Sequence, residues 1–481
     1  MAQIAQHRFF SDALLVRLRI GIGRRFMRIV GAALARQFSR SLVSRMLLLN
    51  GIGALREHTK NLWLWAEPIL VRKRPRCGRS AMHESDWLQR TSPAFRLMIA
   101  TSWLAPKSCQ KHQEEAIRQA IGAKPDWAEY LRLVDRHRTP ALSWAALGRV
   151  PDLAVPEPAK QELRGRNDAC RVQAVRHCLQ LGRVLKGFNR TGIPVMPLKG
   201  PILSSELYGD VGLRQSKDID LAVAPDDLYR AQACLNDLDW HLDSSWFPMT
   251  PRQWERLLRT EQHLSFIQSQ GGCVLELHWR NHWDPPGLDN TRWARSILSV
   301  WQGCFHQEMD PIDQVLYLCG HGGAHAWFRA KWLGDLARIH TAGRVNWQAA
   351  LDHAISTGQE KPLLVCLQLL YVVHGLPMPG LQRNPSENLP SFLVESPLRE
   401  IRASKDPASS SAIDVLSYLL RLSYYKKLVQ PRRTWRESLS ELAYSREDCR
   451  VLRLPDSLFW AYVPLRPVLW AWRKFSRLWA R

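Results

Sequence analysis

Two aspartates separated by a single residue stand near the middle of the chain. Asp218 and Asp220 open the alternating run Asp-Ile-Asp-Leu-Ala-Val at residues 218–223. In a β-strand, successive side chains point to opposite faces, so both carboxylates would project to one side and the aliphatic side chains to the other. Two close negative charges repel each other unless a cation lies between them, and a hard divalent ion such as Mg²⁺ prefers such oxygen ligands. The spacing therefore predicts a metal-binding strand.

Two further segments offer groups that this chemistry needs. Lys199-Gly200 follows the short apolar run 193–198 and precedes a short helix, so a cation and backbone N–H groups could contact phosphate oxygens there. Glu276 lies in the alternating run 274–278 and shares a face with His278. Glu276 is therefore a candidate third carboxylate, and His278 could orient it, contact substrate or serve as a structural histidine.

Together these segments satisfy the requirements of two-metal phosphoryl transfer. One ion would activate an attacking hydroxyl and the other would bridge a triphosphate, while three carboxylates hold both ions. Arg214 stands four residues before Asp218 in a glycine-bearing loop and could neutralise the triphosphate or pair with a nearby acid. The interpretation as a phosphate ligand is preferred.

In this combination the sequence resembles the nucleotidyltransferase superfamily typified by DNA polymerase β, and more narrowly a bacterial family of uncharacterised nucleotidyltransferases. The resemblance covers roughly residues 96–345. The matching residues are Leu198-Lys199-Gly200, Leu207-Tyr208, Arg214, Asp218-Ile219-Asp220-Leu221, Glu276-Leu277-His278-Trp279, His321, His325, Lys331-Trp332-Leu333 and Asp335-Leu336-Ala337. It implies an α+β fold in which helices flank a mixed β-sheet core, with mainly helical N- and C-terminal regions.

The resemblance also implies an activity and its residues. The expected reaction transfers a nucleoside monophosphate from an NTP to an unidentified hydroxyl-type acceptor and releases pyrophosphate. The implied metal ligands and catalytic residues, for Mg²⁺ or Mn²⁺, are Asp218, Asp220 and Glu276, and the implied nucleotide-binding residues are Lys199, Gly200 and Arg214. The sequence departs from the superfamily pattern at Pro201, which follows Gly200 where a serine is usual. Ser204 or Lys199 could replace the missing hydroxyl.

Further candidates for the cleft lie in the helical region that follows. They are Ser204, His278, His321, His325, Lys331 and Asp335. His321 and His325 stand one helical turn apart and could face a metal, but the residues between them lack the glutamate of a zinc-protease helix. Packing histidines are the preferred interpretation. Gly320, Gly322 and Gly323 lower helix propensity there, which predicts close packing.

Hydrophobic periodicity predicts the elements that would position these residues. Helices are expected within 114–147, over 168–188 with Gly192 at the end, over 225–238, and from Asp310-Pro311 onward. Strands are expected at 193–198, 217–223, 263–268 and 273–279, the last two joined by a turn at 270–272. Beyond residue 290 the pattern is helical. The expected regions are a basic extension 1–95, a helical lead-in 96–190, an α/β core 191–295, a helical domain 296–375, a Pro/Ser-rich connector 376–411 and a helical, Trp-rich C-terminal region 412–481.

The excess positive charge lies mainly at the ends of the chain. The 481 residues carry a net charge of +23, and residues 1–100 alone contribute +13. This Arg-rich stretch could be a presequence, a membrane-surface helix, a nucleic-acid arm, or codons upstream of a true start at Met82 or Met98. The basic, aromatic 458–481 segment is expected to pack on the helical domain, although it also suits an anionic membrane surface or another polyanion. No motif for specific DNA binding is evident.

Cysteine content and hydropathy indicate the compartment. The ten cysteines include no Cys-x-x-Cys pair, and Cys234, Cys273, Cys319 and Cys366 lie in apolar contexts typical of a core. No apolar run reaches the roughly 18 residues of a membrane-spanning helix. The expected location is the cytoplasm, with peripheral contact at the inner membrane surface as an option. Two alternative functions remain open, a non-catalytic accessory protein that docks at a membrane or biosynthetic partner, and a toxin-like nucleotidyltransferase that modifies tRNA.

Overall fold

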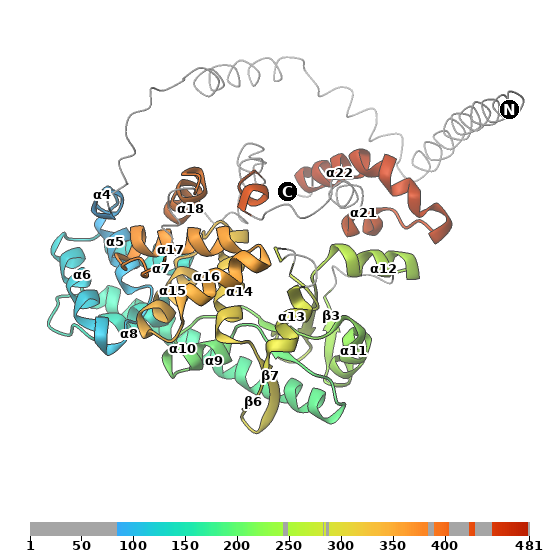
Figure 1. Cartoon of the computed structure of the whole chain (residues 1–481), viewed down its shortest axis with the longest axis horizontal. Coiled ribbons are helices and arrows are strands. Elements are labelled where there is room, and N and C mark those ends of the chain that lie inside the picture. The colour runs from blue at the N-terminus through green and yellow to red at the C-terminus, as the bar shows by residue number, and fades with distance from the viewer. Residues whose placement is uncertain are drawn as a thin grey trace, which may run out of the picture. The chain divides into compact units, whose positions relative to one another are not determined.

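The structure, a computed structural model, describes residues 84–243, 249–281, 283–284, 288–382, 389–403, 423–428 and 445–479 (Figure 1). The chain divides into two compact units, 1–80 and 81–481, and all of the described residues belong to the second. Most of the basic extension expected at 1–95 therefore lies outside the described residues, as does Met82.

Helices make up most of the described part, and they both precede and follow the strands of the sheet in the sequence. The α-helices are α4 (Glu84–Gln89), α5 (Pro93–Thr101), α6 (Gln110–Gly122), α7 (Trp127–His137), α8 (Pro140–Leu147), α9 (Glu157–Arg190), α10 (Pro201–Tyr208), α11 (Leu228–Asp237), α12 (Pro251–Thr260), α13 (Leu288–Arg295), α14 (Pro311–Ala324), α15 (Ala330–Ala342), α16 (Trp347–Thr357), α17 (Glu360–His374), α18 (Phe392–Arg402), α21 (Arg446–Val451) and α22 (Tyr462–Trp479). Short 3₁₀ helices are η1 (Lys107–Cys109), η2 (Pro225–Asp227) and η5 (Asp456–Ala461).

The central sheet has five strands in the order β1-β2-β5-β4-β3. Their bounds are β1 (Met196–Pro197), β2 (Ile219–Ala222), β3 (Trp240–Leu242), β4 (His263–Gln268) and β5 (Val274–His278). β2 and β5 are parallel, whereas the other neighbouring pairs are antiparallel. The expectation of an α+β fold with a mixed sheet flanked by helices is confirmed.

The two faces of the central strands differ in polarity. Ile219 and Leu221 on β2, and Leu275 and Leu277 on β5, are buried together in one hydrophobic core. The intervening side chains point the other way, because side chains alternate along a strand. This second face carries Asp220, Glu276 and His278, so the sheet core positions the polar groups.

Helix α9 connects this sheet core to a second, helical core. Near its end, Leu185 and Phe188 pack into the sheet core, whereas Leu163 near its start belongs to the helical core. The helical core also holds α5, α14, α15 and α17. In Figure 1 the orange α17 lies against the blue α4, although the two are far apart in sequence. The polar face of the sheet therefore lies against a layer of helices. Some of these helices precede the sheet in the sequence and others follow it.

Glycines bring the helices of that layer close to their neighbours. A Cβ on Gly320 would lie 2.5 Å from the Trp283 ring, and one on Gly322 would lie 2.4 Å from the Trp327 ring. On α15, a Cβ on Gly334 would lie 2.7 Å from the carbonyl oxygen of Ser102 on the neighbouring segment. The close packing predicted for the α14 glycines is confirmed.

Several predicted boundaries agree with the structure. Strand β4 has its predicted bounds, and the turn before β5 contains Gly271 and Gly272, both with positive φ. Helix α9 ends two residues before Gly192, and Asp310 accepts a hydrogen bond from the Ile312 N–H at the start of α14. The N-terminal strand is shorter than predicted, since β1 covers only two residues.

Other predictions from the sequence were wrong. The helical pattern predicted beyond residue 290 is interrupted by a hairpin, β6 (Ile297–Trp301) and β7 (Cys304–Glu308), whose turn residues Gln302 and Gly303 both have positive φ. Strand β3 was not predicted. Helix α18 lies inside the segment 376–411, which was predicted to be a Pro/Ser-rich connector. These elements are short, and tertiary contacts decide their conformation.

The C-terminal helices dock on α12 rather than burying all of their aromatic side chains. Gln253 donates hydrogen bonds to the carbonyl of Leu454 and to the Tyr462 hydroxyl. Tyr462 is buried, but Trp460 and Trp470 are about half exposed, at 51% and 50%. The segment was expected to pack on the helical domain, but in the described residues it contacts α12 of the α/β core, and its aromatic side chains are only partly buried. Within the described part, no helix is long and apolar enough to cross a membrane.

The close approach at Gly334 gives a test of the packing. We expect Gly334→Ala to lower the free energy of unfolding by about 1–3 kcal/mol, because a methyl group would collide with the backbone at Ser102. Gly165→Ala, on the exposed face of α9 with open space around it, is the matched control and should raise stability by about 0.5–1 kcal/mol. Denaturant unfolding monitored by circular dichroism measures both. If both substitutions changed the free energy of unfolding equally, the close packing of Gly334 on Ser102 would be contradicted.

Candidate active site

Strand register brings two of the predicted metal ligands together. Asp220 on β2 lies opposite Glu276 on the parallel strand β5, and both point to the polar face of the sheet. Lys199 follows β1, and the Leu198 N–H donates to the carbonyl of Asp220. The pairing of three strands thus places a lysine and two carboxylates in one small region.

Asp220 is buried and lies between the side chains of Lys199 and His278. Lys199 Nζ is 3.3 Å from Asp220 Oδ1, and His278 Nε2 is 3.4 Å from the same oxygen. Burial alone would raise the pKa of Asp220, but Lys199 and His278 together hold it below its usual range. Asp220 in turn raises the pKa of Lys199. The carboxylate is therefore ionised, and the protein supplies its counter-charges.

Asp218 precedes β2 directly and behaves differently from Asp220. Its side chain is half-buried, and burial together with the charges of Asp220 and Glu276 raises its pKa to about 6. These mutual effects show that the three carboxylates share one electrostatic environment. Excess negative charge of this kind attracts a cation.

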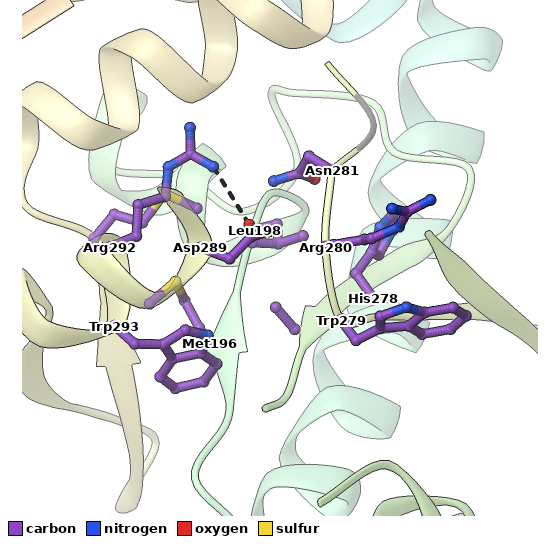
Figure 2. A pocket seen from close by; sticks show the side chains of 11 residues that line it. Met196, Leu198, His278, Trp279, Arg280, Asn281, Asp289, Arg292 and Trp293 are labelled. Carbon is purple, nitrogen blue, oxygen red and sulfur yellow. Dashed lines mark ion pairs between the residues drawn. The ribbon is translucent and has the colours of Figure 1, made fainter. Parts of the chain in front are cut away.

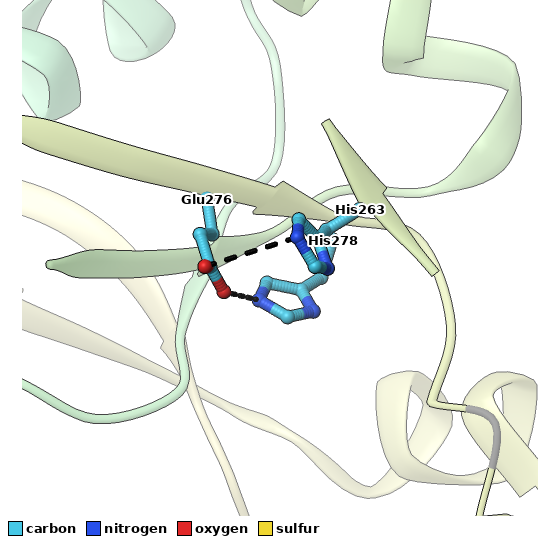
Figure 3. A group of neighbouring side chains, drawn as sticks. All are labelled: His263, Glu276 and His278. Carbon is cyan, nitrogen blue, oxygen red and sulfur yellow. Dashed lines mark ion pairs between the residues drawn. The ribbon is translucent and has the colours of Figure 1, made fainter. Parts of the chain in front are cut away.

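Two histidines, His263 and His278, lie beside Glu276 (Figure 3). His278 Nε2 lies 3.4 Å from Glu276 Oε2, and His263 Nε2 on β4 lies 3.8 Å from Glu276 Oε1. Burial would lower the pKa of His278, but the neighbouring carboxylates of Asp220 and Glu276 raise it. Burial and the neighbouring His278 lower the pKa of His263 to about 4. Among the described residues these three form a group whose ligand atoms lie within 4.8 Å of one another.

Gly200 begins the loop predicted to contact phosphate. Its φ of +79° is one that other residues rarely adopt, and it caps the N-terminus of α10. The hydroxyl of Ser204, one turn later, donates to the carbonyl of Asp210 and accepts from the Arg214 N–H. Ser204 therefore holds the loop 210–214, and its hydroxyl is engaged.

Arg214 and Asp335 form a buried ion pair. Arg214 Nε donates to Asp335 Oδ2 at 2.8 Å, and the two side chains are only 2% and 0% exposed. Lys331 is also buried, and its ammonium donates to the carbonyl of Gln215. Burial and the charge of Arg214 lower the pKa of Lys331 well below its usual value. These residues tie α15 to the loop that precedes Asp218.

Helix α14 places aromatic and histidine side chains near Lys199. Burial raises the pKa of Tyr317, and the charge of Lys199 opposes this shift. Burial and the same lysine lower the pKa values of His321 and His325. The two histidine rings contact each other and the ring of Trp332. This agrees with the interpretation of both histidines as packing residues.

A small pocket lies beside His278 at the ends of β1, β2 and β5 (Figure 2). Trp293 contributes an aromatic ring to it, and Asn281 contributes an amide. Burial and the charge of Asp284 raise the pKa of Asp289 in its wall to about 7, and Arg292 lies 3.7 Å from that carboxylate. The pocket combines apolar surfaces with a few polar groups, but its volume of about 20 Å³ suits a water molecule rather than a nucleotide.

The donor set fits a divalent ion. Asp218, Asp220 and Glu276 supply hard oxygen ligands that suit Mg²⁺ or Mn²⁺. The register of β2 and β5 sets Asp220 opposite Glu276. Burial and the charges of these two acids raise the pKa of Asp218, and a bound cation would lower it again.

A comparison with protein-family models gives one match. The model described as an uncharacterised nucleotidyltransferase matches residues 123–373, more than half of the chain and all of the strands and helices described above for the site. The chain belongs to this family of uncharacterised nucleotidyltransferases. Membership supports nucleotidyl transfer as the general class of activity, and with it an NTP as substrate. The comparisons with curated proteins and with solved structures gave no match.

Two residues of this candidate site were not predicted from the sequence. His263 faces His278 across the β4–β5 ladder, and Tyr317 lies near Lys199. The predicted hairpin contained the signal for His263, because pairing Gln268 with residue 273 also pairs His263 with His278. The position of Tyr317 depends on how α14 packs over the sheet, which the local sequence does not indicate.

The Arg214–Asp335 pair predicts a large loss of stability on substitution. Asp335→Ala would leave a buried guanidinium without its partner, so we expect the free energy of unfolding to fall by about 3–5 kcal/mol. Glu255→Gln is the control, because Glu255 pairs with Arg259 on the exposed face of α12 and should contribute little. Denaturant titration of both variants provides the measurement. A loss no larger than that of the control would show that the pair is not buried.

Proposed function

We propose that the protein is a metal-dependent nucleotidyltransferase that transfers a nucleoside monophosphate from an NTP to a hydroxyl-type acceptor and releases pyrophosphate. The observation that carries the proposal is the register of β2 and β5, which sets Asp220 opposite Glu276. Asp218 adds a third carboxylate, and Lys199 a cation, to the same region. Family membership supports the reaction class.

In this proposal each residue has a distinct role. Asp218, Asp220 and Glu276 hold Mg²⁺ or Mn²⁺, which when bound neutralises the triphosphate and activates the acceptor hydroxyl. The acceptor oxygen bonds to the α-phosphorus while the bond to pyrophosphate breaks, and Glu276 accepts the hydroxyl proton. Lys199 and the backbone at Gly200 contact phosphate oxygens.

The proposed roles of Arg214 and Ser204 differ from the phosphate-binding roles considered from the sequence. Both are engaged in holding the loop 210–214, Arg214 through Asp335 and Ser204 through the loop backbone. We therefore assign them to shaping the nucleotide loop and not to contact with phosphate. Lys331 supports the same loop through the carbonyl of Gln215.

The role of Glu276 can be tested with a conservative substitution. Glu276→Gln keeps the size of a half-buried side chain but removes its charge, so the fold should survive while transfer falls about 100-fold or more. Release of labelled pyrophosphate from each NTP, with Mg²⁺ or Mn²⁺ and cell extract as the acceptor source, is the measurement. Asp226→Asn, an exposed acid in η2, is the matched control.

A second substitution separates loss of chemistry from loss of folding. Asp220→Asn should also abolish transfer, with a circular dichroism spectrum like that of the wild type. If either Glu276→Gln or Asp220→Asn retained full transfer activity, the assignment of these carboxylates would be wrong.

A non-catalytic accessory role is the second candidate function, because α22 exposes an apolar face. Val463, Val468 and Trp470 on α22 are each at least half exposed, as is Trp460 just before it. Arg466 and Arg473 lie on the same helix and pair with Asp448. Such a face could bind the headgroup region of an anionic membrane.

Liposome co-sedimentation tests this role with the full-length protein. Membrane docking through α22 predicts that Trp470→Ser weakens binding to vesicles with anionic lipid, whereas Val172→Ser, at an exposed valine on α9, leaves it unchanged. Equal binding of all three proteins, or binding to neutral vesicles alone, would contradict docking through this face.

A further inference from the structure

Glu276 lies in a group with two histidines, His263 and His278. These histidines have no role in the proposed three-carboxylate metal site. His278 is 3% exposed, and within the described residues neither of its ring nitrogens has a hydrogen-bond partner of acceptable geometry. Its Nε2 nevertheless lies between two carboxylates, 3.4 Å from Asp220 Oδ1 and 3.4 Å from Glu276 Oε2. A buried nitrogen of this kind needs an explanation.

The distances within the group match those around a four-coordinate ion. Adjacent ligands of a tetrahedral ion with bonds of about 2.1 Å lie about 3.4 Å apart. Both contacts of His278 Nε2 have this length, and His263 Nε2 lies 3.8 Å from Glu276 Oε1. The strand pairing His263↔His278 fixes the two imidazoles side by side, with ring centroids 4.9 Å apart (Figure 3).

The nature of the ligands indicates which ions fit. Imidazole nitrogen suits zinc-class transition ions, whereas Mg²⁺ prefers an octahedral shell of oxygens and retains much of its water. We propose that His263, Glu276 and His278, with water in the fourth position, form a mixed histidine–carboxylate site that selects Zn²⁺ or Co²⁺ over Mg²⁺. This inference deepens the proposed function and rests on it for the position of the ion beside the nucleotide.

In this arrangement the polar face of the sheet is divided between two kinds of metal position. The Asp218 side supplies oxygens only and holds the Mg²⁺ that accompanies the triphosphate. The Glu276 side supplies two nitrogens as well, and it holds a resident transition ion in the absence of nucleotide. The division follows from the chain, because the two nitrogens come from β4 and β5, whereas Asp218 directly precedes β2.

Metal binding to the full-length protein tests the inference without reference to activity. Protein freed of metal by chelation is titrated with Co²⁺, whose visible absorption reports four-coordinate ligation, and then with Zn²⁺ in competition. The wild type should bind one Co²⁺ with the bands of a four-coordinate ion, and Zn²⁺ should displace it. A hundredfold excess of Mg²⁺ should leave the spectrum unchanged.

Two variants locate the ion. His263→Ala, at a side chain only partly buried on β4, should weaken Co²⁺ binding at least tenfold and change the spectrum. His241→Ala, at an exposed histidine on the adjacent strand β3, is the matched control and should bind like the wild type. Wild-type binding without the four-coordinate bands, equal binding by His263→Ala, or displacement of Co²⁺ by Mg²⁺ would each overturn the proposal.

The outcomes also separate this inference from the proposed reaction. Four-coordinate Co²⁺ at this site, without nucleotidyl transfer under any metal condition, would support the site and contradict the reaction. Transfer that proceeds with Mg²⁺ alone, in a protein that binds no Co²⁺, would support the reaction and contradict the site.

Discussion

A carboxylate buried on the polar face of the sheet, Asp220, is the feature on which the rest of the site depends. Ionised groups leave water at a high free-energy cost, so a buried carboxylate needs cations or hydrogen-bond donors close to it. Lys199 and His278 meet this need from two neighbouring strands. Their positions follow from the sheet order, because β1 and β5 flank β2 on its two sides. The order of the strands therefore decides which charged side chains lie beside Asp220.

The helical layer also buries charged side chains in pairs of opposite charge. Arg214 and Asp335 neutralise each other out of contact with solvent, and they join α15 to the loop before Asp218. Glycines on α14 and α15 let the helices approach aromatic rings and backbone closely enough to enclose these charges. In the proposed reaction, the metal ions that accompany the nucleotide would replace the internal counter-charges of Asp220. Before that, Lys199 and His278 keep the carboxylate ionised.

Local sequence signals predicted the parts of this site that lie on well-patterned elements. The alternation around Asp220 and Glu276 identified two strands, and a glycine at position 200 identified a turn that other residues rarely form. Long-range packing decided the rest. Arg214 was expected at a phosphate or beside an acid, and the acid that pairs with it is Asp335, 121 residues away in the chain. Likewise the hairpin at 297–308 is shaped by its contacts with α9 and β1, which no local pattern reveals.

The central claim is that Asp220 exchanges its protein counter-charges for metal ions when nucleotide binds. A crystal structure of the full-length protein with Mn²⁺ and a non-hydrolysable NTP analogue tests it most directly, because anomalous scattering locates the ions. The account predicts Mn²⁺ about 2.2 Å from oxygens of Asp220 and Asp218, with Lys199 turned to the triphosphate. Lys199 and His278 still in contact with Asp220, with the analogue bound elsewhere and no ion between the carboxylates, would contradict it.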